Sequence, residues 1–187
     1  MRKIIYLIHV SLDGYTAGPN GEMDWIVYND EVADVSHALH DSTDTAIYGR
    51  VTYEMMASYW PTVLDQPNPD PSDVKHARWL ATAQKIAVST TLKSVSWENT
   101  RILSSDLEGE FKTMKGQPGK DMWLLGSPTL ARSMMKLGLI DEYLININPV
   151  VLGAGQSLFA NLDVELSLNL LSSRVLKGGV VTTHYST

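Results

Sequence analysis

Two glycine residues stand where an apolar run meets a helical pattern, and junctions of this kind can hold phosphate. The first junction is Ile47–Thr52 and the second is Leu124–Leu130. In each, the glycine lets the backbone turn sharply, and the helix that follows directs free backbone N–H groups outward. Parallel α/β sheets bind ligands beyond the carboxyl ends of their strands, so two such junctions side by side could hold a dinucleotide. Arg50 would add a positive charge there, and Thr52 and Ser127 would add hydroxyl donors.

The same junctions also have an ordinary structural explanation. Glycine and serine are common where a strand turns into a helix. Neither stretch matches the dinucleotide fingerprint with three glycines or the nucleotide-binding loop that ends in Gly-Lys-Ser/Thr. Arg50 is followed four residues later by Glu54, which is the spacing of an ion pair on a helix surface. On the residues alone, phosphate binding and plain turn structure both stay open.

A glycine-containing loop, Ser11–Gly21, follows the first apolar run and leaves it at the same end of the predicted sheet. Its glycines make it either mobile or tightly turned, as a loop that closes over a ligand would be. Asp13 in this loop, and Asp30 and Glu31 at a predicted helix start, are carboxylates that could donate or relay a proton. Asp13 could equally cap the turn, and the helix dipole favours acidic residues at positions such as Asp30 and Glu31.

Several other kinds of site are excluded or disfavoured. The sequence has no cysteine, which removes disulfides, thiolate metal sites, iron–sulfur clusters and the cysteine-ligated zinc of deaminases. No Gly-x-Ser-x-Gly nucleophile elbow is present. His37 and His40 have the spacing of metal ligands on a helix, but no third ligand follows nearby. We therefore interpret them as solvated helix histidines and expect no metal.

The elements that must position these residues alternate between strand and helix. Ile4–Val10 is apolar on both faces, as in a strand covered by helices on each side. The other predicted strands are Thr45–Tyr48, Lys85–Ser89, Met122–Leu125, Tyr143–Val151, Leu166–Val175 and Val180–Tyr185. The predicted helices are Glu31–Leu39, Val51–Tyr59, one from the capping box Ser105–Glu108 to about Gly116, and one from Ser127 and Pro128 to Gly138.

Only strands follow Gly138, with Lys177–Gly179 as a turn. We therefore predict an α/β fold with a largely parallel sheet, helices on both faces and antiparallel strands at the C-terminal edge. Pro61–Pro71 holds four of the eight prolines and could be a domain linker. Because the alternation resumes behind it, we predict a surface loop within a single domain over residues 1–187. In Val51–Tyr59, one predicted face carries Thr52, Met55, Met56 and Tyr59.

Composition narrows the class of protein and its partners. Apolar residues make up 44% of the 187 residues and charged residues 19%, which excludes a disordered chain. With 15 Lys and Arg against 21 Asp and Glu, the net charge is −6, so we expect binding neither to nucleic acid nor to anionic membranes. No stretch approaches the roughly 18 apolar residues of a membrane span. We expect a cytoplasmic protein.

Seven short motifs come in one order along the chain: Ser11–Gly14, Gly49–Glu54, Ser89–Leu92, Gly126–Leu130, Gly138–Glu142, Pro149–Gly155 and Leu158–Phe159. Together they resemble the dihydrofolate-reductase-like family, which includes the reductase domain of the bifunctional riboflavin-biosynthesis deaminase–reductases. The resemblance covers about Lys3 to Tyr185. It implies a three-layer α/β/α domain that binds NADPH and passes a hydride to a small heterocycle. Such a substrate would be like 5-amino-6-(5-phosphoribosylamino)uracil or like a pteridine or dihydrofolate. Members of the family are often homodimers.

The resemblance also assigns site residues. Those it implies for NADPH are Ala17, Gly49, Arg50, Val51, Thr52, Ser89, Thr90, Gly126, Ser127, Pro128, Thr129 and Leu130. Those it implies for the substrate are Ser11, Asp13, Trp25, Asp30 and Tyr53, with Asp30 and Asp13 as the candidate catalytic acids.

The sequence departs from the riboflavin-pathway reductases at three places. Leu7 stands where those proteins usually carry a lysine, and Thr90 stands where relatives often have an arginine. Their Asn-Pro-x-Leu-Thr-x-Arg stretch, which serves the phosphoribosyl group, has no counterpart after Tyr53. The substrate is therefore open, and a binding module that keeps the nucleotide site without turnover is the alternative to a reductase. Because Thr90 carries no charge, we expect Arg50 to recognise the adenosine 2′-phosphate of NADPH.

Overall fold

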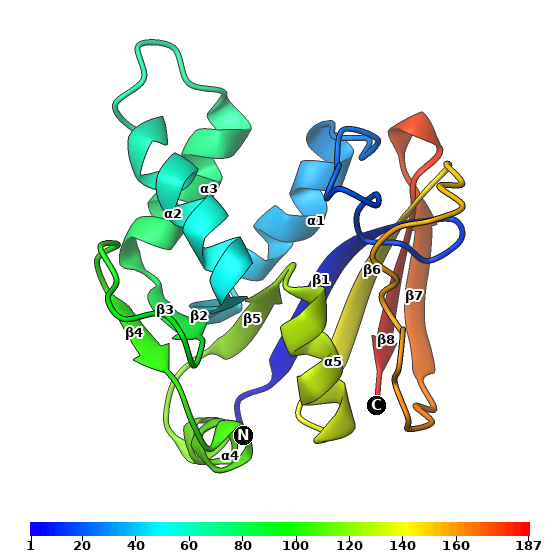
Figure 1. Cartoon of the computed structure of the whole chain (residues 1–187). Coiled ribbons are helices and arrows are strands. Elements are labelled where there is room, and N and C mark those ends of the chain that lie inside the picture. Colours follow the sequence, from blue (N-terminus) through cyan, green and yellow to red (C-terminus); the bar gives the residue numbers. More distant parts are fainter.

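The computed structural model describes all 187 residues and is built around one eight-stranded sheet (Figure 1). The strands are β1 (Ile4–Ser11), β2 (Thr43–Gly49), β3 (Gln84–Val88), β4 (Thr100–Leu103), β5 (Asp121–Leu125), β6 (Glu142–Asn148), β7 (Asn169–Val175) and β8 (Val181–Ser186). Their order across the sheet is β4-β3-β2-β5-β1-β6-β8-β7. All neighbours from β4 to β6 are parallel, and β8 and β7 are antiparallel additions.

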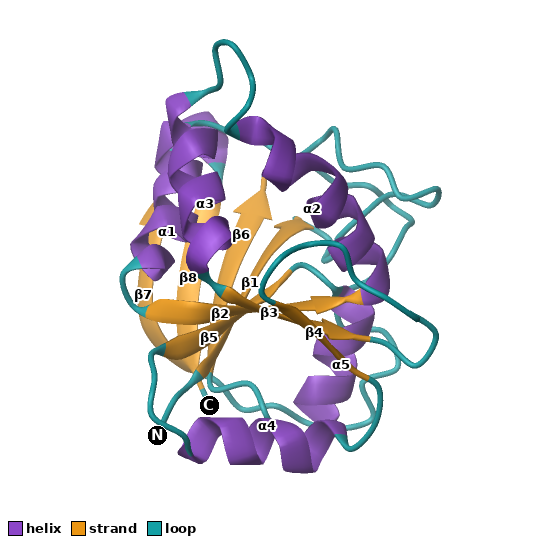
Figure 2. Cartoon of the chain, turned by 90° about the vertical axis from the view of Figure 1, so that its left-hand side faces the viewer, coloured by secondary structure: helices purple, strands orange, loops and turns teal.

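Helices cover both faces of this sheet, which gives the predicted three layers (Figure 2). They are α1 (Asp30–His40), α2 (Arg50–Val63), α3 (Pro71–Thr82), α4 (Leu107–Gly116) and α5 (Pro128–Lys136). The first three lie on one face and the last two on the other (Figure 2). None of them combines the length and the apolar character that crossing a bilayer requires. The predicted α/β fold with antiparallel C-terminal strands is confirmed.

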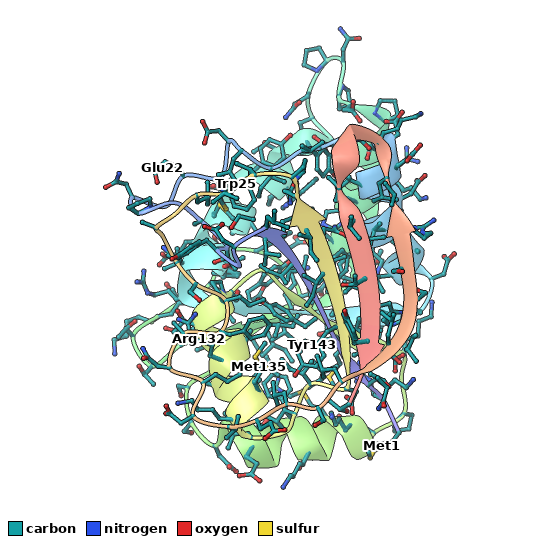
Figure 3. All side chains as sticks on the ribbon, turned by 90° about the vertical axis from the view of Figure 1, so that its right-hand side faces the viewer. Met1, Glu22, Trp25, Arg132, Met135 and Tyr143 are labelled. Atoms are coloured by element: carbon teal, nitrogen blue, oxygen red, sulfur yellow. The ribbon has the colours of Figure 1, made fainter.

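The sheet separates two hydrophobic cores. Under α1, α2 and α3 the core contains Leu7, Tyr48 and Trp123. Under α4 and α5, Met135 and Tyr143 pack together with side chains from the other face of β1 (Figure 3). Because β1 lies between β5 and β6 and is covered on both sides, it is apolar on both faces, as its sequence predicts.

The loop in the proline-rich stretch is shorter than the predicted loop Pro61–Pro71. α2 continues through Pro61 to Val63, and α3 begins at Pro71 with Asp70 as its N-cap, so the loop is confined to residues 64–70. Pro71 stands in the first turn, where the missing N–H has no helical partner to lose. Two elements were not predicted from the sequence, namely α3 and the short edge strand β4.

Some element ends also differ from the prediction. β6 ends at Asn148 rather than near Val151, and β7 begins at Asn169. α4 is capped by Asp106, whose side chain accepts the backbone N–H of Gly109, so the cap lies one residue later than the predicted Ser105. Both residues can accept this bond, and the backbone of the loop selects Asp106.

Candidate functional site

A cavity of about 1380 Å³ lies along the carboxyl ends of the parallel strands. Its wall includes the loop after β1, parts of α1, α2 and α3, the start of α4, and α5. Small-molecule pockets commonly measure roughly 300–1,000 Å³, so this cavity has room for two ligands. A smaller hollow of about 400 Å³, around Arg2 and Gly119 at the amino end of β1, contains no helix N-terminus.

The two glycine junctions meet in the wall of this cavity because β2 and β5 are neighbours in the sheet. The backbone N–H of Gly49 donates to Ser127 Oγ at 2.8 Å, and Ser127 Oγ donates to the carbonyl of Leu125 at 3.0 Å. Gly126 has a φ of +52°, and a Cβ there would lie 3.4 Å from Cγ2 of Thr52. One serine hydroxyl therefore joins the two junctions, and they lie side by side as the sequence predicts.

The helices that start at these junctions differ from the other three at their N-termini. A side chain caps α1, α3 and α4, namely Asn29, Asp70 and Asp106, and each of these helices has an acidic residue in its first turn. α2 and α5 have neither a side-chain cap nor an acidic residue there. Their free N–H groups and the positive ends of their dipoles are thus available to an anion at the cavity.

Three charged side chains line the cavity: Arg50, Asp106 and Arg132. Arg132 of α5 donates to the carbonyl of Ser157 at 2.9 Å, and it lies beside the loop after β6 (Figure 3). Arg50 pairs with Glu54 at 2.8 Å on the surface of α2, which is the alternative weighed for it in the sequence. Both side chains of this pair are nearly half exposed, so the ion pair contributes little to stability. A phosphate could therefore replace Glu54 as the partner of Arg50.

The loop after β1 is tightly turned and hydrogen-bonded to the loop after β6. Asp13 accepts hydrogen bonds from Ser11 Oγ and from the backbone N–H groups of Leu152 and Gly153, at 2.7 to 3.1 Å. The Ser11 hydroxyl and these backbone bonds lower the pKa of Asp13. In this geometry Asp13 holds the loop in place, which is the turn-capping role that the sequence left open.

A second set of bonds fixes the part of this loop that reaches the cavity. Thr16 donates its backbone N–H to the carbonyl of Gln156 at 2.8 Å, and Gln156 donates back to the carbonyl of Ala17 at 2.9 Å. A Cβ on Gly155 would lie only 2.1 Å from the Ala17 carbonyl oxygen. The close approach of the two loops at Ala17 therefore requires glycine at position 155.

All twelve residues that the resemblance implies for NADPH line the cavity: Ala17, Gly49, Arg50, Val51, Thr52, Ser89, Thr90, Gly126, Ser127, Pro128, Thr129 and Leu130. Most of them belong to what we call the outer part of the cavity. It consists of the lining residues within 49–52, 88–90, 103–107, 126–133 and 155–160.

The five residues implied for the substrate do not line the cavity. Ser11 and Asp13 hold the loop described above. Tyr53 is buried between Tyr48 and Trp97 in the core, where its hydroxyl accepts the backbone N–H of Trp97. Trp25 and Asp30 also lie outside the cavity wall.

Trp25 donates its indole N–H to the carbonyl of Glu22 at 2.9 Å, within the loop itself (Figure 3). Asp30 is exposed in the first turn of α1, behind the N-cap Asn29. That is the helix-start position that the dipole favours. The structure thus brings neither side chain to the cavity wall.

A second set of lining residues forms what we call the inner part of the cavity, on the face of the sheet covered by α1, α2 and α3. Its residues are Leu7, His9, Met23, Ile26, Tyr28, Ser36, Met55, Met56, Trp60, His76, Trp123 and Leu125. None of these residues was predicted from the sequence to belong to the site. The one usable signal was on α2, where three of the four residues of the predicted face line the cavity, namely Thr52, Met55 and Met56.

His37 and His40 lie behind the inner part of the cavity. Their interpretation as solvated helix histidines is therefore wrong. His37 is 8% exposed, and His40 Nε2 is 2.9 Å from Nδ1 of the buried His76. His40 also stacks on Trp79 with ring centroids 5.3 Å apart. Burial lowers the pKa of His76 to about 3 and that of His40 to about 4. The rings of His40 and His76 are therefore uncharged at neutral pH, and they belong to an aromatic cluster between α1 and α3.

Comparison with known proteins places this chain in a family. The model of the RibD C-terminal domain matches residues 2–182. The uncharacterized protein YyaP of Bacillus subtilis strain 168 is 31% identical over 184 residues, which cover 98% of this chain and 94% of that protein.

Solved structures agree with this match. A candidate riboflavin biosynthesis protein of Shewanella sp. PV-4 is 25% identical, with a TM-score of 0.76 and 98% of each chain covered. A dihydrofolate reductase of Enterococcus faecalis, complexed with NADP(H), is 12% identical with a TM-score of 0.62. It covers 98% of this chain and 95% of its own, and it shares the fold.

Proposed function

The chain belongs to the family of the RibD C-terminal domain, and on that premise we propose that it is an NADPH-dependent reductase of a small heterocycle. One observation carries the proposal more than any other. The only two α-helices without a side-chain N-cap, α2 and α5, follow adjacent strands and open onto the same cavity. An anion with two linked phosphates matches this arrangement better than any single charged group does.

The residues of the outer part fit NADPH. The free N–H groups at the starts of α2 and α5 would hold the diphosphate, and Ser127 keeps these two starts together. Arg50, once released from Glu54, would bind the 2′-phosphate with its guanidinium. When bound, NADPH would supply the hydride.

The chain itself would contribute orientation and the exclusion of water. The hydrogen-bonded loop at Ala17 closes one side of the cavity, and Gly155 lets the two loops approach each other closely. The inner part leaves room for a second ligand next to the outer part. Holding cofactor and substrate side by side in a fixed geometry is the main contribution a protein makes to hydride transfer.

The test has a binding arm and a turnover arm. NADPH at about a hundred times its dissociation constant should add roughly 2.7 kcal/mol of stability, which for a chain of this size is about 5–11 °C in Tm. Purified protein should then oxidise NADPH in the presence of at least one member of a panel of pterins, folates and aminouracils. Absence of any NADPH-induced shift in Tm would refute the proposal at its first step.

A non-catalytic nucleotide-binding module on the same fold is the second candidate. The observation that favours it is the scarcity of acids at the cavity, where Asp106 is the one carboxylate and already caps α4. A module of this kind would show the full Tm shift with NADPH and no oxidation of NADPH with any compound of the panel. The two arms together therefore separate reductase from binding module.

A further inference from the structure

Reduction of a double bond by hydride also requires a proton, and the inner part of the cavity has few groups that could supply one. The carboxylate of the wall, Asp106, belongs to the outer part and already caps α4. Burial lowers the pKa of His9 to about 4 and that of His76 to about 3, so neither ring carries a second proton at neutral pH. Two hydroxyl groups remain, those of Ser36 and Tyr28, and Ser36 donates its proton to a carbonyl within α1.

Tyr28 stands just before α1, and its hydroxyl contacts the start of α3. The side chain of Ser72 forms a hydrogen bond with this hydroxyl. Burial raises the pKa of Tyr28, the bond with Ser72 lowers it, and the nearby carboxylates at the start of α3 raise it, with a net rise. Tyr28 therefore holds its proton at neutral pH, and with 58% of its surface exposed it is accessible to a ligand in the cavity.

His37 of α1 extends this contact away from the cavity. Its Nε2 atom lies 3.3 Å from Ser72 Oγ and 3.2 Å from the carbonyl oxygen of Ser72. Its Nδ1 atom lies 3.6 Å from a carboxylate oxygen of Asp34. Carbonyl and carboxylate oxygens only accept hydrogen bonds, so both ring nitrogens of His37 face acceptors. This arrangement suits an imidazolium, in which both nitrogens are donors.

Tyr28, Ser72, His37 and Asp34 thus form one chain of polar groups between the cavity and the surface. The chain crosses the contact between α1 and α3, which lie side by side (Figure 2). The side chain of Asp34 is 71% exposed, so this end of the chain is in contact with water. Hydroxyl groups and imidazole rings both donate and accept hydrogen bonds, so a proton can pass along such a chain.

We propose that Tyr28 is the proton donor of the reaction, and that Ser72 and His37 position its hydroxyl and restore its proton. The inference rests on the proposed function, because it completes the hydride transfer of that reaction. The geometry that carries it is the continuous chain from the cavity wall to the exposed Asp34.

The step balances in atoms and charge. The double bond of the substrate would receive the hydride at its carbon, and its electron pair would take the Tyr28 proton at the other atom. The tyrosinate would take the proton of Ser72 Oγ, which in turn would take the Nε2 proton of the His37 imidazolium. The neutral imidazole would recover a proton from water beside Asp34, so the protein returns to its starting state.

The hydrogen-bonded chain is tested without turnover. In carbon NMR spectra of protein labelled at the tyrosine ζ carbon, Ser72→Ala should raise the pKa of Tyr28 further, because it removes the bond that lowers this pKa. Tyr28→Phe assigns the resonance. Tyr59 is the matched control, since its hydroxyl donates to Asp73 at 2.7 Å and it does not line the cavity. The titration of Tyr59 should stay in place in Ser72→Ala.

Turnover tests the role of Tyr28. With a compound that the protein reduces, Tyr28→Phe should lower kcat at least about a hundredfold, the lower range for general acid catalysis, and leave KM and the Kd of NADPH nearly unchanged. Ser72→Ala and His37→Gln should lower kcat less, because the hydroxyl of Tyr28 remains and can regain its proton from water. Tyr59→Phe should match the unmodified protein.

Two contrary results overturn the inference. An unchanged titration of Tyr28 in Ser72→Ala would refute the chain, and equal kcat values for Tyr28→Phe and Tyr59→Phe would refute Tyr28 as the donor. In the second case the protein still oxidises NADPH, so the proposed function stands and only the inference fails. If no compound is reduced although NADPH binds, the proposed reductase fails and the inference fails with it.

Discussion

The outer and inner parts of the cavity are built in different ways. The outer part consists of short continuous segments, such as Arg50–Thr52 and Ser127–Leu130, and offers mostly backbone N–H groups at helix starts. The inner part consists of isolated side chains, among them His9, His76 and Trp123, that distant elements bring together. Backbone groups recognise what all dinucleotides share, whereas side chains decide which ring is accepted. If the proposed function is right, relatives built on this plan would keep the cofactor site and change substrate by point substitutions in the inner part.

The largest expected effect belongs to Trp123, which is 2% exposed and forms both core and inner wall. We expect Trp123→Ala to lower the free energy of unfolding by about 3–5 kcal/mol, because the cavity it leaves is large. Urea denaturation measures this. Val51→Ala, at an exposed position of the outer part, should change stability by no more than about 0.5 kcal/mol. Similar losses of unfolding free energy in Trp123→Ala and Val51→Ala would mean that the two parts of the cavity are not built differently.

The second prediction concerns the one cationic side chain at the start of α2. Arg50→Ala should weaken NADPH binding by about 1.5–3 kcal/mol, the range of a hydrogen bond to a charged group, and leave NADH binding nearly unchanged. Glu54→Gln is the matched control, since it removes the ion-pair partner and leaves Arg50 free to bind phosphate. Dissociation constants for both cofactors check this. If NADH binds the unmodified protein as tightly as NADPH, Arg50 does not select the 2′-phosphate.

The third prediction is that the protein loses stability at acidic pH because of the histidines at and behind the inner part of the cavity. Burial holds the pKa of His76 near 3, while the unfolded chain protonates the same ring near 6.5. Below pH 6.5 the unfolded state therefore binds more protons, and stability falls as the pH falls. From pH 7.5 to 5.5, His76 should account for about 1.4 kcal/mol of the loss.

His40 and His9, whose pKa values are also lowered, act in the same direction, and the outer part contains no histidine. Urea midpoints at the two pH values measure the effect, with tryptophan fluorescence as the signal. His76→Gln should flatten the pH dependence. An unchanged profile in this variant would contradict the assignment of His76.

The smallest expected effect comes from the hydroxyl that joins the two junctions. Ser127→Ala leaves the N–H of Gly49 without its acceptor and should cost about 1 kcal/mol of stability, because this N–H is only partly buried. Ser133→Ala removes a longer bond of 3.3 Å on the exposed side of α5 and should be nearly neutral. Thermal unfolding of the two variants checks the difference. A Ser127→Ala protein as stable as the unmodified one would show that the junctions do not depend on this hydroxyl.

The sequence indicated the outer part because its signals are local. A glycine between an apolar run and a helical pattern specifies its own turn, so Gly49 and Gly126 could be placed before any tertiary structure was known. The inner part has no such signal. His9 sits in an apolar strand and looks like a core residue, and His76 lies on a mixed helix that the hydrophobic pattern does not reveal.

The carboxylates show a different dependence on tertiary structure. The chemistry of Asp30 and Asp13 and their place in the sequence predict a site role, whereas in the structure Asp13 bonds to the loop after β6 and Asp30 stands in the first turn of α1. Whether an acid faces a cavity depends on the direction of its side chain after packing. That direction is set by contacts with distant residues, such as those of Asp13 with Leu152 and Gly153, which pattern alone does not contain.

The position of β1 has a consequence for the synthesis of the protein. This strand is buried on both faces, yet its neighbours are β5 and β6, in which Ile5 pairs with Trp123 and Glu142. At roughly 5–20 residues per second, on the order of ten seconds separate the emergence of β1 from that of its partners. Throughout that interval the nascent chain carries a strand that is apolar on both sides and has no sheet to join. The segment at the centre of the finished sheet is therefore apolar surface exposed to aggregation while the ribosome is still at work.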